Sequence, residues 1–348
     1  MRQIFRKIER DGIYLIFVSM KRMCFRRVLS PIGVVVLLLL NVAGVAAGAS
    51  GISEKELAVQ VSELNRLFSK MYEGGDENRW NACDSFTHAA RQVMEDYADK
   101  DFPFDRIRNL NYFKAENGSF RMLNWGIPEA SGTVTYKALL QVHRPNKNDH
   151  ILYELNDMSV YYPYPEGEIL TPDTWWGAFY YQCIEKKVDN RTYYTFLGWN
   201  SGNPLYQQSV VEVMRIKSDG SVEFGAPLFV NKGRVAGTER IDKTLKDSEI
   251  KRVVFRFSRK SGMILRYDYQ SYIEKNAKGK KVERKADMII FDVLTPRQTA
   301  MSDDYAYYIP MGGKYQAYVF QDNKWRLKSD VSARNPERHP KSPRPKHP

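Results

Sequence analysis

The sequence has 348 residues, of which 43% are hydrophobic and 27% are charged. These values are typical of globular proteins and exclude collagen, coiled coils, fully disordered chains and multi-pass membrane proteins. The formal net charge of +12 lies mostly at the two ends, because residues 1–49 carry +6 and residues 331–348 carry +4, which leaves +2 for residues 50–330. A nucleic-acid-binding protein needs a cationic surface on its folded body, so we expect no nucleic-acid partner.

Residues 1–49 are predicted to be a secretory signal peptide. An apolar run from Ile32 to Ala47 follows several cationic residues and ends in small residues that fit a cleavage site. The run is shorter than the roughly 20 residues that cross a bilayer core. A start at Met20 would give this leader ordinary dimensions, and a retained signal anchor is the alternative. We therefore expect export through the inner membrane to the periplasm, the outer membrane or the exterior.

Residues 50–108 are predicted to form a helical hairpin. Ser53 and Glu56 form a capping-box pattern, and apolar residues at helical spacing predict a helix from about Ser53 to Tyr72. A second helix is expected from about Arg79 to Asp99, with His88 on its exposed face. Two such amphipathic helices cannot bury both apolar stripes alone, so the hairpin must dock on another surface.

Residues 109–330 are predicted to form an antiparallel β-meander of ten to twelve strands. Asn117-Gly118 and Asp219-Gly220 are hairpin signals, because a type I′ turn needs positive φ at both central positions. The fold class is therefore α+β, mainly β, with the helical hairpin docked on a body that is a sandwich, a wide barrel or a partial propeller. The expected strands are 119–126, 133–143, 150–158, 174–186, 192–199, 209–217, 221–230, 251–258, 263–271, 286–294 and 315–321.

Residues 331–348 contain five prolines and no aromatic residue. They are predicted to be a disordered basic tail, because they cannot bury enough apolar area to become ordered. The functional alternative is contact of this tail with anionic envelope polymers or lipid headgroups.

Two cysteines, Cys83 and Cys183, remain once the leader is removed. In an oxidising compartment two thiols either pair or stay buried. Both lie in otherwise apolar patterns, so the sequence leaves a Cys83–Cys183 disulfide open.

Familiar catalytic and cofactor motifs are absent from the sequence. It contains no H-E-x-x-H, C-x-x-C, G-x-S-x-G or G-x-G-x-x-G, so we expect no metal and no cofactor. Glycoside hydrolysis needs only two suitably placed carboxylates, and Glu129, Asp157 and Asp292 lie near strand ends where burial can raise a pKa. The alternative is that Glu129 is a loop acid and that Asp157 and Asp292 accept hydrogen bonds from turn amides.

Aromatic residues make up 13% of the chain and concentrate in residues 161–164, 175–181 and 193–199. Strand alternation gives this region two apolar faces, of which one is core and the other must be covered by the helices, a partner or a ligand. Rigid aromatic rings suit stacking on sugars or gripping an extended peptide. The candidate ligand-binding residues are Trp175, Trp176, Tyr180, Tyr194 and Trp199. The alternative is a strand buried between the helix pair and a second layer.

Five motifs follow one another along the chain: YYQCI at Tyr180, YTFLGWNSGN at Tyr194, EFGAPLF at Glu223, the RVVFRFS…MILRYD pair from Arg252, and IIFDVLTP at Ile289. In this order they resemble the motifs of a family of uncharacterised exported proteins from Bacteroidota. The resemblance implies export and a β-rich body, and it carries no activity over to this chain. Asn200 replaces the acid of the family's GWDG, Ser201 is an extra residue, and Val293 replaces the histidine of FDHL.

The sequence favours a non-enzymatic envelope protein that binds another envelope protein or a glycan. A secreted or periplasmic glycan hydrolase that uses paired carboxylates is the alternative. A membrane-tethered accessory subunit is a third interpretation, and it requires the apolar run to survive in the mature chain.

Overall fold

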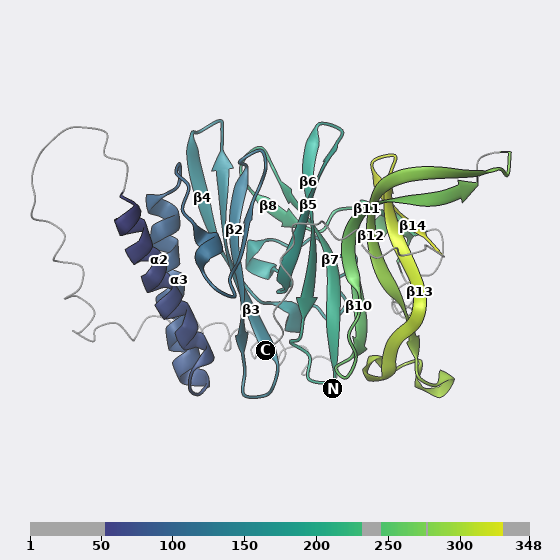
Figure 1. Cartoon of the computed structure of the whole chain (residues 1–348), viewed down its shortest axis with the longest axis horizontal. Coiled ribbons are helices and arrows are strands. Elements are labelled where there is room, and N and C mark those ends of the chain that lie inside the picture. Colours follow the sequence, from purple (N-terminus) through teal and green to yellow (C-terminus); the bar gives the residue numbers. More distant parts are fainter. Residues whose placement is uncertain (1–52, 232–244, 276–277, 330–348) are drawn as a thin grey trace, which may run out of the picture. The chain divides into compact units, whose positions relative to one another are not determined.

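The computed structural model describes residues 53–231, 245–275 and 278–329, which form three antiparallel sheets and two helices near the N-terminus (Figure 1). The predicted signal peptide and basic tail lie outside these residues. Neither described helix is long and apolar enough to cross a membrane. The described sheets do not close into a barrel, so the wide-barrel option is wrong.

The helical hairpin is confirmed. It consists of α2 (Glu54–Ser69) and α3 (Asp76–Asp96). Gly74, with φ +71°, reverses the chain between them, in a conformation that glycine adopts without a Cβ penalty. His88 is exposed, as expected. Seven 3₁₀ turns also occur in the described residues: Lys70–Tyr72, Phe104–Arg106, Ser159–Tyr161, Pro172–Thr174, Asp247–Glu249, Thr299–Met301 and Tyr305–Tyr307.

Sheet A is a four-stranded meander under the helices. Its strands pair in chain order: β1 (Asn111–Lys114), β2 (Phe120–Pro128), β3 (Val134–Arg144) and β4 (Asp149–Asn156). The core beneath the helix pair combines helical side chains with Leu123, Trp125 and Leu139 of this sheet. The helices therefore dock on sheet A.

Two polar side chains on the face of β3 that the helices cover, Lys137 and Gln141, are also buried. Lys137 is 9% exposed and Gln141 is 2% exposed. Lys137 Nζ lies 3.3 Å from Glu154 Oε1, and Gln141 Nε2 donates to the Met94 carbonyl at 2.9 Å. Buried polar groups need such partners, and the side chains of Lys137 and Gln141 both have one.

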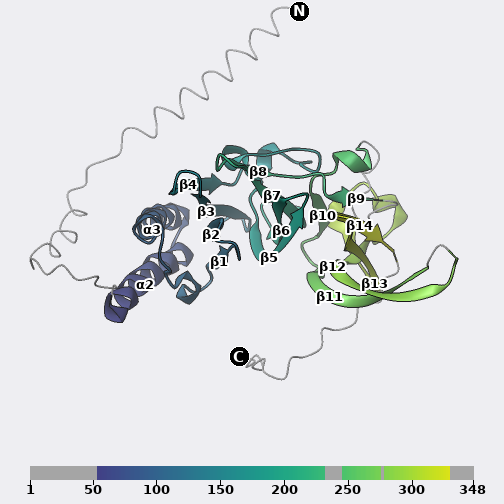
Figure 2. The ribbon, with the colours of Figure 1, turned by 90° about the horizontal axis from the view of Figure 1, so that it is seen from above.

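Sheet B is the middle layer. Its strands β5 (Phe179–Val188), β6 (Arg191–Asn200), β7 (Tyr206–Ile216) and β10 (Val253–Ser258) lie in the order β10-β7-β6-β5, and β8 (Val222–Phe224) pairs with β7. One face packs on sheet A through Tyr180, Phe196 and Val210. The other packs on the third sheet through Leu197, Val211 and Phe255. Two sheets, rather than the helix pair, cover the aromatic strands (Figure 2).

Sheet C completes the layers. Its order is β11-β12-β13-β14-β9, and the pairing of β14 with β9 is parallel. Its strands are β9 (Phe229–Val230), β11 (Leu265–Lys275), β12 (Lys281–Pro296), β13 (Tyr308–Gln321) and β14 (Lys324–Lys328). The segment predicted as one strand over 221–230 is split between sheets B and C. The short strands β1 and β14 were not predicted, because four or five residues give too little alternation to detect.

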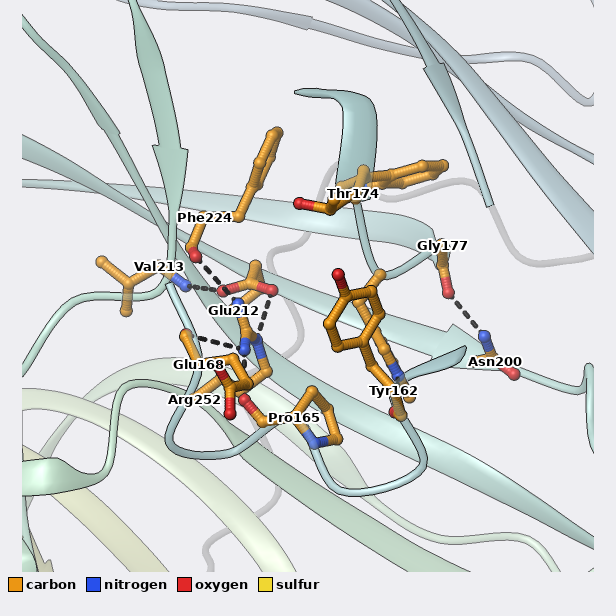
Figure 3. A network of polar contacts seen from close by, with 12 residues as sticks. Tyr162, Pro165, Glu168, Thr174, Gly177, Asn200, Glu212, Val213, Phe224 and Arg252 are labelled. Carbon is orange, nitrogen blue, oxygen red and sulfur yellow. Dashed lines mark hydrogen bonds and ion pairs between the residues drawn. The ribbon is translucent and has the colours of Figure 1, made fainter. Parts of the chain in front are cut away.

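A buried ion pair joins the middle sheet to the loop before β5. Glu212 on β7 and Arg252 next to β10 have fully buried side chains, and Arg252 Nε donates to Glu212 Oε2 at 2.7 Å (Figure 3). Arg252 also donates to the carbonyls of Pro165, Glu168 and Phe224. Burial raises the pKa of Glu212, and the Arg252 guanidinium opposes that rise. The pair ties residues 165–168 to sheet B.

A second buried pair holds the same loop. Arg256 on β10 donates to Glu166 Oε1 at 2.7 Å and to the Pro163 carbonyl at 2.7 Å. Its guanidinium lies over the rings of Tyr164 and Tyr305, at 5.2 and 5.6 Å from their centroids. These contacts fix the path by which the chain passes from sheet A into sheet B.

Replacing Glu212 with glutamine should destabilise the fold strongly. Glu212→Gln leaves the Arg252 charge buried without a counter-ion, and we expect the free energy of unfolding to fall by about 3 kcal/mol. Urea denaturation measures it. The matched control is Glu63→Gln, which removes the exposed ion pair with Arg66 and should cost less than about 0.5 kcal/mol. Equal losses for the two variants would contradict a structural role for the buried pair.

Candidate functional site

A cavity of about 650 Å³ lies at one end of sheets A and B. Its volume is within the range of ligand pockets, roughly 300–1,000 Å³. We call it the turn cavity. It is lined by Asn117, Ser119, His143, Pro145, Asn146, Asn190, Arg191, Thr192, Tyr194, Arg215, Ile216, Lys217 and Ser218.

The meander topology gathers these residues. In a meander every second turn lies at the same end of a sheet, so the β1–β2 and β3–β4 turns of sheet A share one end, and so do the β5–β6 and β7–β8 turns of sheet B. Contacts between the sheets hold the ends together: Tyr153 Oη donates to the Gly220 carbonyl at 3.0 Å. Asp189 and Asn190 both have positive φ, 47° and 62°, which allows the tight β5–β6 turn.

Tyr194 is the polar centre of the cavity wall. Its hydroxyl lies 2.5 Å from Ser119 Oγ, and it accepts a hydrogen bond from Asn117 Nδ2 at 3.2 Å. Burial raises the pKa of Tyr194, so its hydroxyl stays protonated at neutral pH and can donate or accept. Sheet A and sheet B therefore present a connected set of hydroxyl and amide groups.

Three cations border the cavity. Arg215 and Lys217 both pair with Glu223 on β8. Arg191 is exposed, and no ion pair is found for it within residues 53–231, 245–275 and 278–329. Arg191 is therefore the cation of this wall that has a free guanidinium to offer a ligand.

A second cavity of about 320 Å³ adjoins the turn cavity through His143, which lines both. We call it the histidine cavity. His143 on β3 and His150 on β4 are cross-strand neighbours whose ring centroids lie 4.8 Å apart. His150 Nε2 lies 3.8 Å from Asp99 Oδ1. Arg121, Gln141, Lys100 and Lys114 also line this cavity.

The His150 environment predicts a pH dependence of stability. Burial, with the nearby His143, lowers the pKa of His150 below its ordinary 6.5. The unfolded chain therefore takes up this proton first, and the His150 contribution to stability is present above about pH 6.5 and is lost as pH falls through the folded pKa. Between pH about 7.5 and 5.5, wild type should lose more stability than His150→Gln in denaturation experiments. His88→Gln, at an exposed histidine, should behave like wild type, and identical pH profiles for all three would contradict the prediction.

A third cavity, of about 380 Å³, lies between sheets B and C. We call it the aromatic cavity. Its rings are Tyr181, Trp199 and Phe257. Their polar atoms are already used: Trp199 Nε1 donates to Gln207 Oε1 at 3.1 Å, and Tyr181 Oη donates to the Leu265 carbonyl at 2.8 Å. The Gln207 amide donates to the Ser261 carbonyl at 2.5 Å. The site suits an apolar group.

The predicted ligand-binding residues do not form one exposed strip. Trp175, Trp176, Tyr180 and Tyr194 are at most 2% exposed, and Trp175 Nε1 donates to Tyr180 Oη at 3.0 Å inside the core. Trp175 and Trp176 also precede β5 rather than lying on it. Tyr194 lines the turn cavity and half-buried Trp199 lines the aromatic cavity, towards opposite ends of β6.

The three candidate acids accept hydrogen bonds from protein groups. Glu129 accepts from Thr135 Oγ1 at 2.7 Å. Asp157 accepts from the Ser159 amide at 2.8 Å, and Asp292 accepts from the Ile264 amide at 2.7 Å. Burial raises the pKa of Asp157 and of Asp292. The turn-amide interpretation is confirmed for both. None of the three acids lines any of the three cavities.

The disulfide left open by the sequence is not formed. Cys83 and Cys183 are both free, because Cys83 lies in the core under the helices and Cys183 packs against the core between sheets A and B. Burial raises the pKa of Cys183 to about 12, so its thiol is unreactive at neutral pH. No group of three or more histidine, cysteine or acidic side chains in the described part of the chain is placed to hold a metal ion.

No family model matches the chain, and no curated protein or solved structure matches it. The resemblance to exported Bacteroidota proteins therefore stays a prediction. Sequence reasoning missed Asn146, Asn190 and Arg191 as site residues. The Asn117-Gly118 turn is the sequence feature that could have indicated them, because the β3–β4, β5–β6 and β7–β8 turns lie at the same end of the two sheets as this turn.

Proposed function

We propose that this protein is an exported, non-enzymatic cell-envelope protein that binds a glycan in the turn cavity. The observation that carries the proposal is the lining of that cavity, in which amide and hydroxyl side chains from four turns surround Tyr194. A sugar presents hydroxyl groups that both donate and accept, and side-chain amides and hydroxyls can do the same. Export is supported by the predicted leader.

The polar lining favours a glycan over a protein partner. Interface cores are depleted in charged residues and rely on buried apolar anchors. In the turn cavity Ile216 and Pro145 are the apolar members beside many polar side chains. The aromatic cavity has the opposite character, because its polar atoms are bonded internally, so a peptide side chain would suit it better than a sugar.

The hydrolase alternative lacks a carboxylate pair at the turn cavity. No aspartate or glutamate lines that cavity, whereas glycoside hydrolysis uses two acids on either side of the bond that breaks. Glu212 is fully buried and bonded to Arg252, so it has no access to a substrate. The absence of acidic side chains from the lining of the turn cavity supports a protein that binds a glycan without hydrolysing it.

Removing the Tyr194 hydroxyl should weaken glycan binding. We expect Tyr194→Phe to bind an immobilised oligosaccharide about five- to tenfold more weakly than wild type, because one hydrogen bond is lost and Asn117 and Ser119 lose their anchor. The full chain is titrated against the oligosaccharides that it retains on a glycan array. The matched control is Tyr181→Phe in the aromatic cavity, which removes a hydroxyl that is bonded only to the Leu265 carbonyl.

Thermal unfolding of both variants separates binding from folding. If both variants are about equally stable and only Tyr194→Phe loses affinity for the oligosaccharide, the result supports glycan binding in the turn cavity. Equal loss in both variants, or retention of no oligosaccharide by the wild-type chain, argues against the proposal.

A further inference from the structure

Among the described residues, three arginines are buried: Arg121, Arg252 and Arg256. Arg252 and Arg256 each face a buried carboxylate, Glu212 and Glu166. Removal of a charge from water costs several kcal/mol unless a counter-ion is present. Two of the three buried arginines are therefore neutralised inside the protein.

Arg121 has no such counter-ion. It is 7% exposed, and its Nε donates to Gln141 Oε1 at 2.6 Å. Its terminal nitrogens donate to the main-chain carbonyls of Lys100, Met94 and Tyr97, at 3.1, 2.7 and 2.6 Å. All four acceptors are uncharged, and within the described ranges no ion pair is found for Arg121. Burial lowers its pKa, yet a guanidinium stays protonated in proteins.

The uncompensated charge lies in the wall of the histidine cavity. Two acids also line this cavity, but Asp99 and Asp101 have side chains 85% and 84% exposed, and Asp101 is paired with Lys114. Solvent screens such exposed carboxylates, so they neutralise a buried cation poorly. Lys100 adds an exposed cation to the same wall.

The cavity also holds an unused polar atom. His143 Nδ1 is buried and has no hydrogen-bond partner in the described structure, and a buried polar atom without a partner carries a free-energy cost. His143 is the residue that the histidine cavity shares with the turn cavity. The two cavities are therefore neighbours at this side chain, and Arg121 lies in the wall of the histidine cavity.

We infer that the histidine cavity binds the acidic group of the ligand, so that the glycan proposed for the turn cavity is an acidic one. This inference rests on the proposed function and adds the ligand's charge to it. The group is a carboxylate, a sulfate or a phosphate, since each accepts charge-assisted hydrogen bonds from a guanidinium. It supplies the counter-ion that Arg121 lacks, with Lys100 and the two imidazoles around it.

The test compares oligosaccharides that differ only in charge. The full chain is titrated with a neutral oligosaccharide and with matched chains that end in a uronic acid or carry one sulfate, and separately with inorganic phosphate. We expect the acidic chains to bind at least about tenfold more tightly than the neutral one, as one charge-assisted hydrogen bond implies. The uronic acid and sulfate arms show which acidic group is preferred.

Two substitutions place the preference in the histidine cavity. Lys100→Glu reverses an exposed charge in its wall, and it should abolish the preference for acidic chains while leaving neutral binding unchanged. Lys55→Glu, at an exposed lysine of α2, is the matched control and should keep the preference. Arg121→Gln should also abolish it, and Lys100→Glu keeps the test valid if Arg121→Gln fails to fold.

The outcomes separate this inference from the proposed function. Equal binding of neutral and acidic oligosaccharides, or a preference that survives Lys100→Glu, would overturn the inference and leave glycan binding intact. Binding of inorganic phosphate that Lys100→Glu weakens, with no oligosaccharide bound, would uphold the anion site and overturn the glycan proposal.

Discussion

The buried Glu212–Arg252 ion pair ties the loop between sheets A and B to the middle sheet, and the arrangement of these two layers depends on it. Glu212 lies on a strand that is covered on both sides, so its charge has no route to water. Its partner uses its remaining donors on the carbonyls of Pro165, Glu168 and Phe224. Because a buried charge must be paired, the loop that leaves sheet A can take only a path that brings these carbonyls to Arg252. The connection between sheets A and B is thereby specified.

That connection matters for the candidate site, because the site is an interface between layers. The turn cavity has walls from both sheets, and Tyr194 of sheet B is bonded to Asn117 and Ser119 of sheet A. A shift of one sheet against the other would separate these groups. The turn cavity therefore depends on the packing of sheet A against sheet B, which the core between the two sheets maintains.

The three buried arginines of the described structure differ in whether a carboxylate balances their charge. Arg252 and Arg256 are completed by internal carboxylates and hold a loop. Arg121 holds the end of α3 through main-chain carbonyls and keeps its charge unbalanced at a cavity wall. A fully balanced cation stabilises the fold only, whereas an unbalanced one beside open volume also attracts an anion. This difference distinguishes the anion site that we propose from the buried ion pairs of Arg252 and Arg256.

The sequence predicted the helices and most strands, because local periodicity and turn chemistry encode them. The helix expected from about Ser53 to Tyr72 and the strand expected over 133–143 correspond to α2 and β3 of the structure. The sequence did not indicate that most of the candidate ligand-binding residues are buried. An aromatic-rich segment such as the one that contains Trp175, Trp176 and Tyr180 can bind a ligand, but it can also be covered by protein on both faces. The amino-acid composition is the same in the two cases, so it does not distinguish them.

The sequence by itself determined the local elements, the position of the hairpin turns and the concentration of charge at the chain ends. Only the tertiary structure decided which aromatic residues are buried, that Cys83 and Cys183 lie in different cores, and that Arg121 lacks a counter-ion while Arg252 and Arg256 have one. The physical reason is that burial and charge pairing depend on residues far apart in the chain. Glu166 and Arg256 are separated by 90 positions, and no local pattern records that they meet.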